Sequence, residues 1–261
     1  MSVAGHGPMP KTILVTGGSA GIGFSIAETL GRAGNRVVLA ARNKERLAAA
    51  QTSLKEKNID VSTISLDVRD SIAVADAIDS LDAIDGVVNN AAGNFACRAE
   101  EMTLNGFRAV VEISLYGTFN TSTALARRLI RENKPGAVCN IIATYAWTGG
   151  PSVSHSAAAK AGMLAFGKSV SSEWGEHGIR VNSVAPGFVE TENATNNILS
   201  APGAAEAMLE RIPLGRFAQA DEIAQAVAYL MSEEAAYVTG AVLTIDGGRS
   251  IGPAMHAAQT R

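Results

Sequence analysis

Several features are scarce in this 261-residue chain, and each scarcity excludes a class of protein. The only cysteines are Cys97 and Cys139, too few for a disulfide framework or a cysteine-based zinc site, so we expect no metal. Neither sign of charge is in excess, since the formal net charge is −3, which gives no electrostatic reason to expect nucleic acid or an anionic membrane as partner. No uncharged apolar run approaches the roughly 18 residues that span a bilayer, and residues 1–10 lack the pattern of a signal peptide. We therefore expect a globular, cytoplasmic protein.

Short apolar stretches rich in valine and isoleucine alternate with longer helical patterns. Such stretches predict strands that are covered on both faces. They lie at residues 12–16, 36–40, 61–65, 84–88, 137–142, 179–184 and 241–245. After the first of them, Ile22, Ile26, Leu30 and Ala33 follow at the spacing of a packed helix. The alternation predicts an α/β protein with a Rossmann-type, doubly wound, parallel seven-stranded sheet.

No linker, low-complexity tract or repeat divides the chain, so we expect residues 1–261 to form a single domain. One region, about 188–213, is irregular, with asparagines, Pro202 and Gly203 among helix-forming residues. A long connection after the carboxyl end of a strand lies beside the ligand crevice of an open α/β sheet. We interpret this region as a substrate lid; the alternative is a surface excursion without a role.

The first predicted strand runs into a glycine-rich turn, and a helix follows. Glycines at such a turn let the backbone approach a pyrophosphate, while the helix N-terminus offers unpaired N–H groups and the positive end of its dipole. The position between strand and helix makes this glycine pattern specific. The predicted contacts in the turn are Gly17, Ser19, Gly21, Ile22 and Gly23.

The end of the second strand indicates which dinucleotide is bound. NAD sites carry a carboxylate there for the ribose 2′-hydroxyl, whereas this chain has Ala40-Ala41-Arg42. Because a guanidinium suits a 2′-phosphate, we expect NADPH/NADP; the alternative is that Arg42 is a solvated residue at a helix start. After the third strand, Asp67 and Val68 are placed to meet the adenine, unless Asp67 caps the next helix.

Five motifs together resemble the short-chain dehydrogenase/reductase family. They are residues 16–23, Asn89-Asn90-Ala91-Ala92-Gly93, Lys160, Pro186-Gly187 with Thr191, and Asp246-Gly247-Gly248, in family order. The resemblance implies a seven-stranded parallel sheet with nicotinamide bound at the strand ends. It also implies a homotetramer, in which the apolar segment 251–255 packs against a neighbouring subunit. The further cofactor contacts that it implies are Asn90, Ala91, Ala92, Lys160, Pro186, Gly187 and Thr191.

The catalytic positions depart from the family pattern, which is a Ser, a helix Asn, and a Tyr-x-x-x-Lys. Only Lys160 is retained, on the helix predicted over 154–174. Ser156 stands at the tyrosine position, Ala143 at the serine position and Ser114 at the asparagine position. A serine hydroxyl cannot replace a phenol as proton donor near neutrality. Either the chemistry uses other donors, or the chain is a catalytically silent NADP-binding relative.

Other donors are present, and their pattern resembles the 2,4-dienoyl-CoA reductase branch of the family. The shared motifs are Ala91-Ala92-Gly93-Asn94-Phe95, Tyr145-Ala146-Trp147-Thr148-Gly149, and Ser156 with Lys160. The resemblance implies Asn94, Tyr145, Ser156 and Lys160 as the catalytic residues, with Tyr145 in the loop after the fifth strand. The alternatives are that Asn94 is a turn residue, Tyr145 a half-buried aromatic and Ser156 an ordinary helix residue. We expect His155 to be a packing residue at the helix start rather than an acid.

These residues favour a reaction in which negative charge collects on a thioester oxygen, because the Tyr145 hydroxyl and the Asn94 amide are suitable donors to it. We therefore expect an NADP-dependent oxidoreductase of fatty acid metabolism, acting on CH–CH groups of conjugated acyl thioesters and first of all on 2,4-dienoyl-CoA. The alternative enzyme is a ketone or 3-oxoacyl reductase that uses Tyr145 as its acid. No basic cluster in 188–213 marks the CoA phosphates, so acyl-carrier protein and non-acyl substrates remain open.

Overall fold

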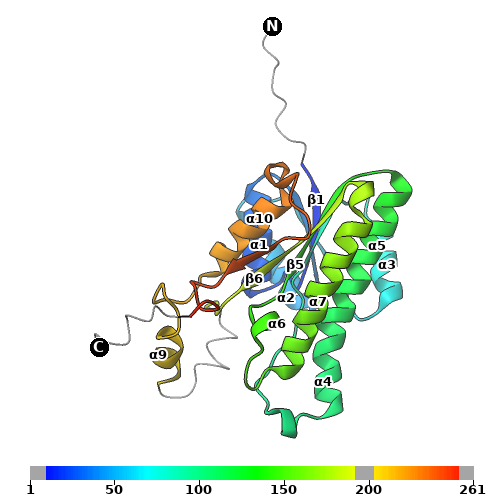
Figure 1. Cartoon of the computed structure of the whole chain (residues 1–261). Helices are drawn as coiled ribbons and strands as arrows, with labels where there is room; N and C mark the ends of the chain where they lie inside the picture. Colours follow the sequence, from blue (N-terminus) through cyan, green and yellow to red (C-terminus); the bar gives the residue numbers. More distant parts are fainter. Residues whose placement is uncertain (1–9, 192–202, 253–261) are drawn as a thin grey trace.

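A seven-stranded parallel sheet forms the centre of the chain, in a computed structural model that describes residues 10–191 and 203–252 (Figure 1). The strands are β1 (Thr12–Thr16), β2 (Arg36–Ala41), β3 (Val61–Ser65), β4 (Gly86–Asn89), β5 (Gly136–Ile141), β6 (Ile179–Pro186) and β7 (Val242–Ile245). Their order is β3-β2-β1-β4-β5-β6-β7, so the predicted fold class is confirmed. The direction of strand addition reverses between β1 and β4, and ligands bind at such a switch point in open α/β sheets.

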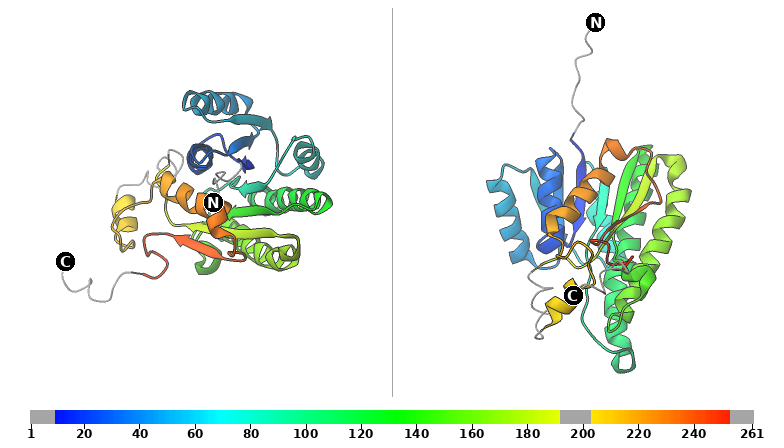
Figure 2. Two further views of the ribbon diagram at one scale, coloured as in Figure 1. Left: turned by 90° about the horizontal axis from the view of Figure 1, so that it is seen from above. Right: turned by 60° about the vertical axis from the view of Figure 1, so that its left-hand side comes forward.

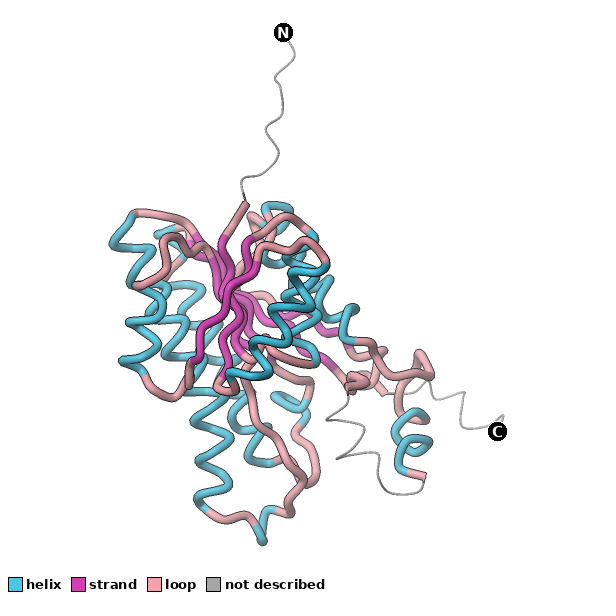
Figure 3. Tube along the Cα trace, turned by 180° about the vertical axis from the view of Figure 1, so that it is seen from behind, coloured by secondary structure: helices cyan, strands magenta, loops and turns pink. Residues whose placement is uncertain are grey.

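Six helices cover the two faces of the sheet (Figure 2). One face carries α1 (Gly21–Arg32), α2 (Lys44–Glu56) and α10 (Ala220–Met231); the other carries α3 (Ser71–Asp79), α5 (Gly117–Glu132) and α7 (Ser154–Glu173). Figure 3 shows the strands enclosed between these helices. The predicted packing face of α1 is correct for Ile26 and Leu30, which are buried, but wrong for Ala33, which is the exposed C-cap.

The shorter helices lie beyond the carboxyl ends of the strands, at the lower end of the molecule in Figure 1. They are α4 (Leu104–Val111), α6 (Tyr145–Thr148) and α9 (Ala204–Leu209). A π-helical turn, Glu112–Tyr116, joins α4 to α5. Single-turn 3-10 helices occur at Ala99–Glu101, Gly175–His177 and Glu233–Ala235. The connections after β4, β5 and β6 therefore gather at one edge of the sheet.

The connection that follows β6 is closed at its base. The backbone N–H of Glu190 donates to the carbonyl of Ala218 at 2.8 Å, and the N–H of Ala218 donates to the carbonyl of Phe188 at 3.0 Å. The rings of Phe188 and Phe217 pack beside these bonds, with centroids 4.5 Å apart. Of the lid predicted over 188–213, residues 192–202 lie outside the described part of the chain. The described part holds the two joined stems and α9.

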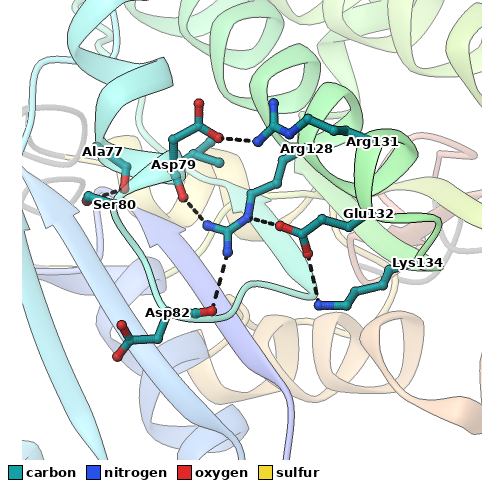
Figure 4. A network of polar contacts seen from close by, with 9 residues as sticks. Ala77, Asp79, Ser80, Asp82, Arg128, Arg131, Glu132 and Lys134 are labelled. Atoms are coloured by element: carbon teal, nitrogen blue, oxygen red, sulfur yellow. Dashed lines mark hydrogen bonds and ion pairs between the residues drawn. The ribbon is translucent and has the colours of Figure 1, made fainter.

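A polar network fastens α3 to α5 at the opposite end of the sheet (Figure 4). Arg128 on α5 is only 6% exposed, and its guanidinium donates to the carbonyls of Ile78 and Asp82. Its Nε also donates to Glu132 at 2.8 Å. Together, Lys134 and Arg128 lower the pKa of Glu132 to about 2. The network satisfies backbone carbonyls where α3 ends and the chain turns toward β4.

Candidate active site

The glycine-rich turn at the end of β1 is tied to the end of β4. The hydroxyl oxygen of Thr16 accepts hydrogen bonds from the backbone N–H groups of Asn90 and Ala91, both at 3.0 Å. The side-chain amide of Asn90 donates to the carbonyl of Thr16 at 3.0 Å. A β-carbon on Gly17 would lie only 2.9 Å from Nδ2 of Asn90. The structure thus brings together three of the predicted cofactor residues, Gly17, Asn90 and Ala91, with Ala92 next in the chain.

The first turn of α1 is suited to an anion. Its N-cap, Ala20, supplies no side-chain hydrogen bond, and no acidic residue stands in the first turn. Gly17 and Gly21 have positive φ angles of 65° and 53°. A β-carbon on Gly23 would lie 2.3 Å from the carbonyl oxygen of Gly17. The backbone N–H of Gly17 donates to the carbonyl of Ala40 at 2.7 Å, so a phosphate would be met by the N–H groups further along the turn, which also contains Ser19 and Ile22.

The segment that follows β6 reaches the same turn. The methyl group of Thr191 lies 3.7 Å from the position that a β-carbon on Gly21 would occupy. The backbone N–H of Gly187 donates to the carbonyl of Ile245 on β7 at 2.9 Å. A β-carbon on Gly187 would lie 2.8 Å from Cα of Asp246. Of the three residues that the resemblance linked to the cofactor, Thr191 thus lies beside the glycine-rich turn, whereas Pro186 and Gly187 pack against the end of β7.

Arg42 is exposed and directly precedes Asn43, the N-cap of α2. It therefore stands at the end of β2 before the helix begins. Its charge contributes to lowering the pKa of Asp67, so the two side chains belong to one electrostatic neighbourhood at the ends of β2 and β3. A ligand phosphate at this edge would meet a guanidinium that no neighbouring helix covers.

Asp67 is engaged by Arg69. Nη2 of Arg69 lies 2.6 Å from Oδ2 of Asp67, and this hydrogen bond is the main cause that lowers the pKa of Asp67. The alternative that Asp67 caps the next helix is wrong, because the N-cap of α3 is Asp70, whose carboxylate accepts from the first N–H groups of that helix. Val68, between them, is buried, and its carbonyl accepts a hydrogen bond from Asn120 at 2.9 Å.

Tyr145 and Ser156 are joined by a hydrogen bond, with 3.0 Å between their hydroxyl oxygens. Tyr145 begins α6, a single helical turn, and not the loop that the sequence predicted. Burial raises the pKa of Tyr145, which keeps its phenol protonated and able to donate at neutral pH. Ser156 is buried in the first turn of α7. The pair places a phenol beside the position where the family tyrosine would stand.

Lys160 lies one turn further along α7 and is buried. Its Nζ donates to the backbone carbonyl of Ile141, at the end of β5, at 2.6 Å. Burial lowers the pKa of Lys160 to about 8. The ammonium group is thus held at the end of β5. Its lowered pKa lies near neutral pH, and perturbed pKa values of this kind are typical of functional sites.

Asn94 lies in the segment after β4 and is exposed. β4 and β5 pair in parallel, with Asn89 opposite Asn140, so the segments that carry Asn94 and Tyr145 leave neighbouring strand ends. Within the described residues, no hydrogen bond joins Asn94 to Tyr145 or Ser156. The structure therefore places the two predicted donors at one edge and brings only the tyrosine and the serine into contact.

Two further positions mark the departure from the family pattern. Ser114 is fully buried in the π-helical turn, and its hydroxyl has no hydrogen-bond partner among the residues described. Ala143, after β5, is buried and has no polar side chain to offer. Such single π-helical turns occur frequently at functional sites.

Sequence reasoning missed the surroundings of His155. It is fully buried, as expected for a packing residue, and its ring packs against the ring of Phe95, with centroids 4.6 Å apart. Sixty positions separate the two residues, and no local pattern links them; the only sequence signal is that both adjoin a predicted catalytic residue.

Neither a membrane-spanning helix nor a metal-binding cluster occurs in residues 10–191 and 203–252. No helix in these ranges is long and apolar enough to cross a membrane. No group of three or more His, Cys, Asp or Glu side chains in them could hold a metal ion.

Comparison with known proteins identifies relatives over nearly the whole chain. A family model described as "Enoyl-(Acyl carrier protein) reductase" matches residues 17–250. A Bacillus subtilis protein named "Probable 2,4-dienoyl-CoA reductase [(2E)-enoyl-CoA-producing]" is 39% identical over 93% of this chain and 98% of its own length. A short-chain dehydrogenase structure from Bacillus anthracis is 40% identical, with a TM-score of 0.84 over 92% of this chain and 96% of its own. A Burkholderia cenocepacia gluconate 5-dehydrogenase, solved with NADP and tartrate, is 29% identical, with a TM-score of 0.88 over 92% and 95%.

Proposed function

The chain belongs to the short-chain dehydrogenase/reductase family of oxidoreductases, and from this membership we propose that it is an NADPH-dependent 2,4-dienoyl-CoA reductase. The family uses nicotinamide cofactors. The name of the Bacillus subtilis relative supports the choice of acyl-CoA substrate. The NADP in the Burkholderia cenocepacia structure supports the choice of cofactor.

The strand ends fit a nicotinamide dinucleotide, since a β-carbon at Gly17 or Gly23 would fill the turn that faces the first helix. In this proposal, Gly17, Ser19, Gly21, Ile22 and Gly23 hold the pyrophosphate, Arg42 holds the 2′-phosphate, and Asp67 and Val68 border the adenine. Asn90, Ala91, Ala92, Lys160, Pro186, Gly187 and Thr191 border the rest of the cofactor. When bound, the reduced nicotinamide supplies the hydride.

The hydrogen bond between Tyr145 and Ser156 carries the assignment to a dienoyl thioester. A ketone reductase with the usual family pattern has its phenol on the lysine's own helix, where it protonates an alkoxide directly. In this chain that position holds a small hydroxyl, and the phenol approaches from α6 instead. In this proposal, the small side chain of Ser156 leaves space for an extended acyl chain, and the hydroxyl of Tyr145 remains as a hydrogen-bond donor at the edge of that space.

The donors suit a charge that spreads over a conjugated system. Reduction at the far end of a dienoyl thioester moves negative charge onto the thioester oxygen, which needs preorganised hydrogen-bond donors more than a strong acid. The Tyr145 phenol stays protonated because burial raises its pKa, and the Asn94 amide can donate at any pH. Lys160, anchored on Ile141, holds the ribose and adds positive charge.

The first test is a substrate panel followed by NADPH absorbance. We expect turnover of 2,4-hexadienoyl-CoA and little or none of crotonyl-CoA or acetoacetyl-CoA. Preferred reduction of acetoacetyl-CoA would replace the proposal with a 3-oxoacyl reductase that uses Tyr145 as its acid. No turnover of any substrate, with NADPH bound, would indicate a silent relative.

The second test removes single donors. Tyr145→Phe deletes one hydroxyl, so kcat for 2,4-hexadienoyl-CoA should fall by about 10²–10³-fold, the usual effect of one lost oxyanion donor. Asn94→Ala should act similarly, and the double variant should show a non-additive loss because both groups serve one oxygen. The matched control is Tyr237→Phe, which removes a hydroxyl from a fully exposed tyrosine. Full activity of Tyr145→Phe would disprove the mechanism.

A further inference from the structure

The ring of Phe95 packs close to two helices, α7 and α4. It packs on His155 of α7, with 4.6 Å between ring centroids and 39° between ring planes. Its Cζ also lies 3.2 Å from the position that a β-carbon on Gly106 of α4 would occupy. The ring therefore has little room to move toward either helix, although the residue is 43% exposed.

His155 is an unusual residue for this position. It is fully buried, and neither ring nitrogen has a hydrogen-bond partner in the described structure. Burial lowers its pKa, so the imidazole is neutral at physiological pH. The backbone of Phe95 lies close enough to oppose this lowering of the pKa, but it forms no hydrogen bond with either ring nitrogen of His155. Buried polar groups without partners are costly, and an ordinary packing position would be filled by an apolar side chain.

The two rings connect the two proposed donors. Phe95 directly follows Asn94, and His155 directly precedes Ser156, which is hydrogen-bonded to Tyr145. A second contact fixes the same segment, because the N–H of Cys97 donates to the carbonyl of Ser152, just before α7, at 2.9 Å. The segment 94–97 is therefore attached to the start of α7 at two points.

We propose that His155 is a positioning residue that holds Phe95 by ring packing and thereby fixes the Asn94 amide relative to the Tyr145 hydroxyl. The inference rests on the proposed function, since it assigns His155 a role in placing one of the two donors. Preorganised donors must be held within fractions of an ångström, and a displacement of about 1 Å can cost up to about 10²-fold in rate.

A double-mutant cycle tests whether His155 acts through Asn94. We expect His155→Ala to lower kcat for 2,4-hexadienoyl-CoA by about 10-fold or more in the native background. In the Asn94→Ala background the same change should have almost no effect, because there is no amide left to position. The dissociation constant of NADPH, measured by cofactor fluorescence, should stay unchanged. Ser154→Ala, an exposed neighbour on the same turn, is the control and should behave as the native protein.

The second readout does not depend on activity. Cys97 is half-exposed within the clamped segment, whereas Cys139 is buried with a pKa raised by burial to about 12. An aromatic disulfide reagent will therefore label Cys97 selectively. We expect His155→Ala to raise the labelling rate of Cys97 several-fold, because the segment opens more often. His155→Phe keeps an aromatic ring in place and should restore both the native labelling rate and kcat.

The outcomes of these experiments either support or overturn the positioning role of His155. An equal loss of kcat from His155→Ala in both backgrounds, or no loss in the native one, overturns the positioning role even if labelling accelerates. Failure of His155→Phe to restore kcat overturns it as well, since packing would then not be the function of the ring. If His155→Ala does not fold, the cycle is run with His155→Phe and Phe95→Leu, and only Phe95→Leu should couple to Asn94→Ala. The proposed function fails separately, when Asn94→Ala and Tyr145→Phe are both fully active.

Discussion

Single side chains decide what the strand ends can do chemically. Replacing the family tyrosine by Ser156 removes one phenol, while Tyr145 brings another from α6 to within 3.0 Å of the serine hydroxyl. The site therefore still contains one phenolic hydroxyl, but this hydroxyl comes from α6 instead of α7. This change in the position of the phenol alters which substrate shapes can enter the site more than it alters the acidity of the proton donor.

Lys160 predicts a pH dependence of stability. Its pKa is about 8 in the folded protein and 10.5 ordinarily, so the unfolded chain binds more protons between these values, and the free energy of unfolding should increase with pH there. Urea unfolding should show that the free energy of unfolding of the native protein rises by about 2 kcal/mol between pH 8 and pH 10, relative to that of Lys160→Met. A loss over this interval would contradict the burial argument.

Arg42 predicts the choice of cofactor. Loss of a charge-assisted phosphate contact costs about 1.5–3 kcal/mol, so Arg42→Ala should raise the KM for NADPH and leave that for NADH almost unchanged. Steady-state kinetics with both cofactors measures this. Arg46→Ala, an exposed arginine on the first turn of α2, is the control. Equal use of NADPH and NADH by the native protein would refute the proposed role.

Individual contacts were less predictable than residue types. The type and order of Tyr145, Ser156 and Lys160 follow from motif spacing, but the hydrogen bond between the first two depends on how α6 packs on α7, which local patterns do not encode. Asp67 was open to two interpretations because a carboxylate after a strand suits both a ligand and a helix cap; Asp70, three residues later, takes the cap. The partner of Tyr145 thus comes from another helix, whereas that of Asp67 is Arg69, only two residues along the chain.

At the scale of elements, the strands could be predicted because valine and isoleucine runs are a local signal. Their ends could not be predicted as well. β6 extends to Pro186, two residues beyond the predicted end, because its last residues pair with β7 as far as Ile245. β4 begins at Gly86, two residues after the predicted start at Ile84. Pairing with a neighbouring strand, which sequence periodicity does not report, determines these ends.

The junction between α3 and α5 predicts a stability hot spot. Arg128→Ala would remove the charged donor of the Ile78 and Asp82 carbonyls, and one hydrogen bond to a charged group contributes about 1.5–3 kcal/mol. Chemical denaturation should show a loss of at least this size. Arg131→Ala removes an exposed ion pair with Asp79 from the same helix and should cost less than about 1 kcal/mol. Equal losses would contradict the importance of the buried guanidinium.

At the scale of the whole molecule, two parts of the surface that carry exposed apolar side chains bear on assembly. One is an open cleft along α5 and α7, lined by Leu115, Tyr116, Phe119 and Phe166. The other is the segment after β7, where Ile251 is almost fully exposed; of the predicted apolar segment 251–255, residues 253–255 lie outside the described part. Exposed apolar patches mark interaction sites. Two such faces suit the two kinds of two-fold contact in a dihedral tetramer.

We therefore expect a homotetramer in solution, measurable by light scattering. Phe119→Glu places a charge in the cleft along α5 and α7 and should reduce the mass to that of a dimer, because the other face is untouched. Ile72→Glu, on the exposed side of α3, is the control and should leave the mass unchanged. A monomer across micromolar concentrations would refute this assembly.

The closed base of the connection after β6 also bears on how the protein can diverge. Since Phe188, Glu190, Ala218 and Phe217 join the two stems, the connection between them, which includes α9, has ends that are already fixed. The entropy of closing a flexible loop grows only logarithmically with its length, so doubling the loop costs about 0.6 kcal/mol. Segments of very different length can thus be exchanged between the stems while the sheet keeps its stability, which makes this connection a part of the chain where changes of length are tolerated readily in evolution or by engineering.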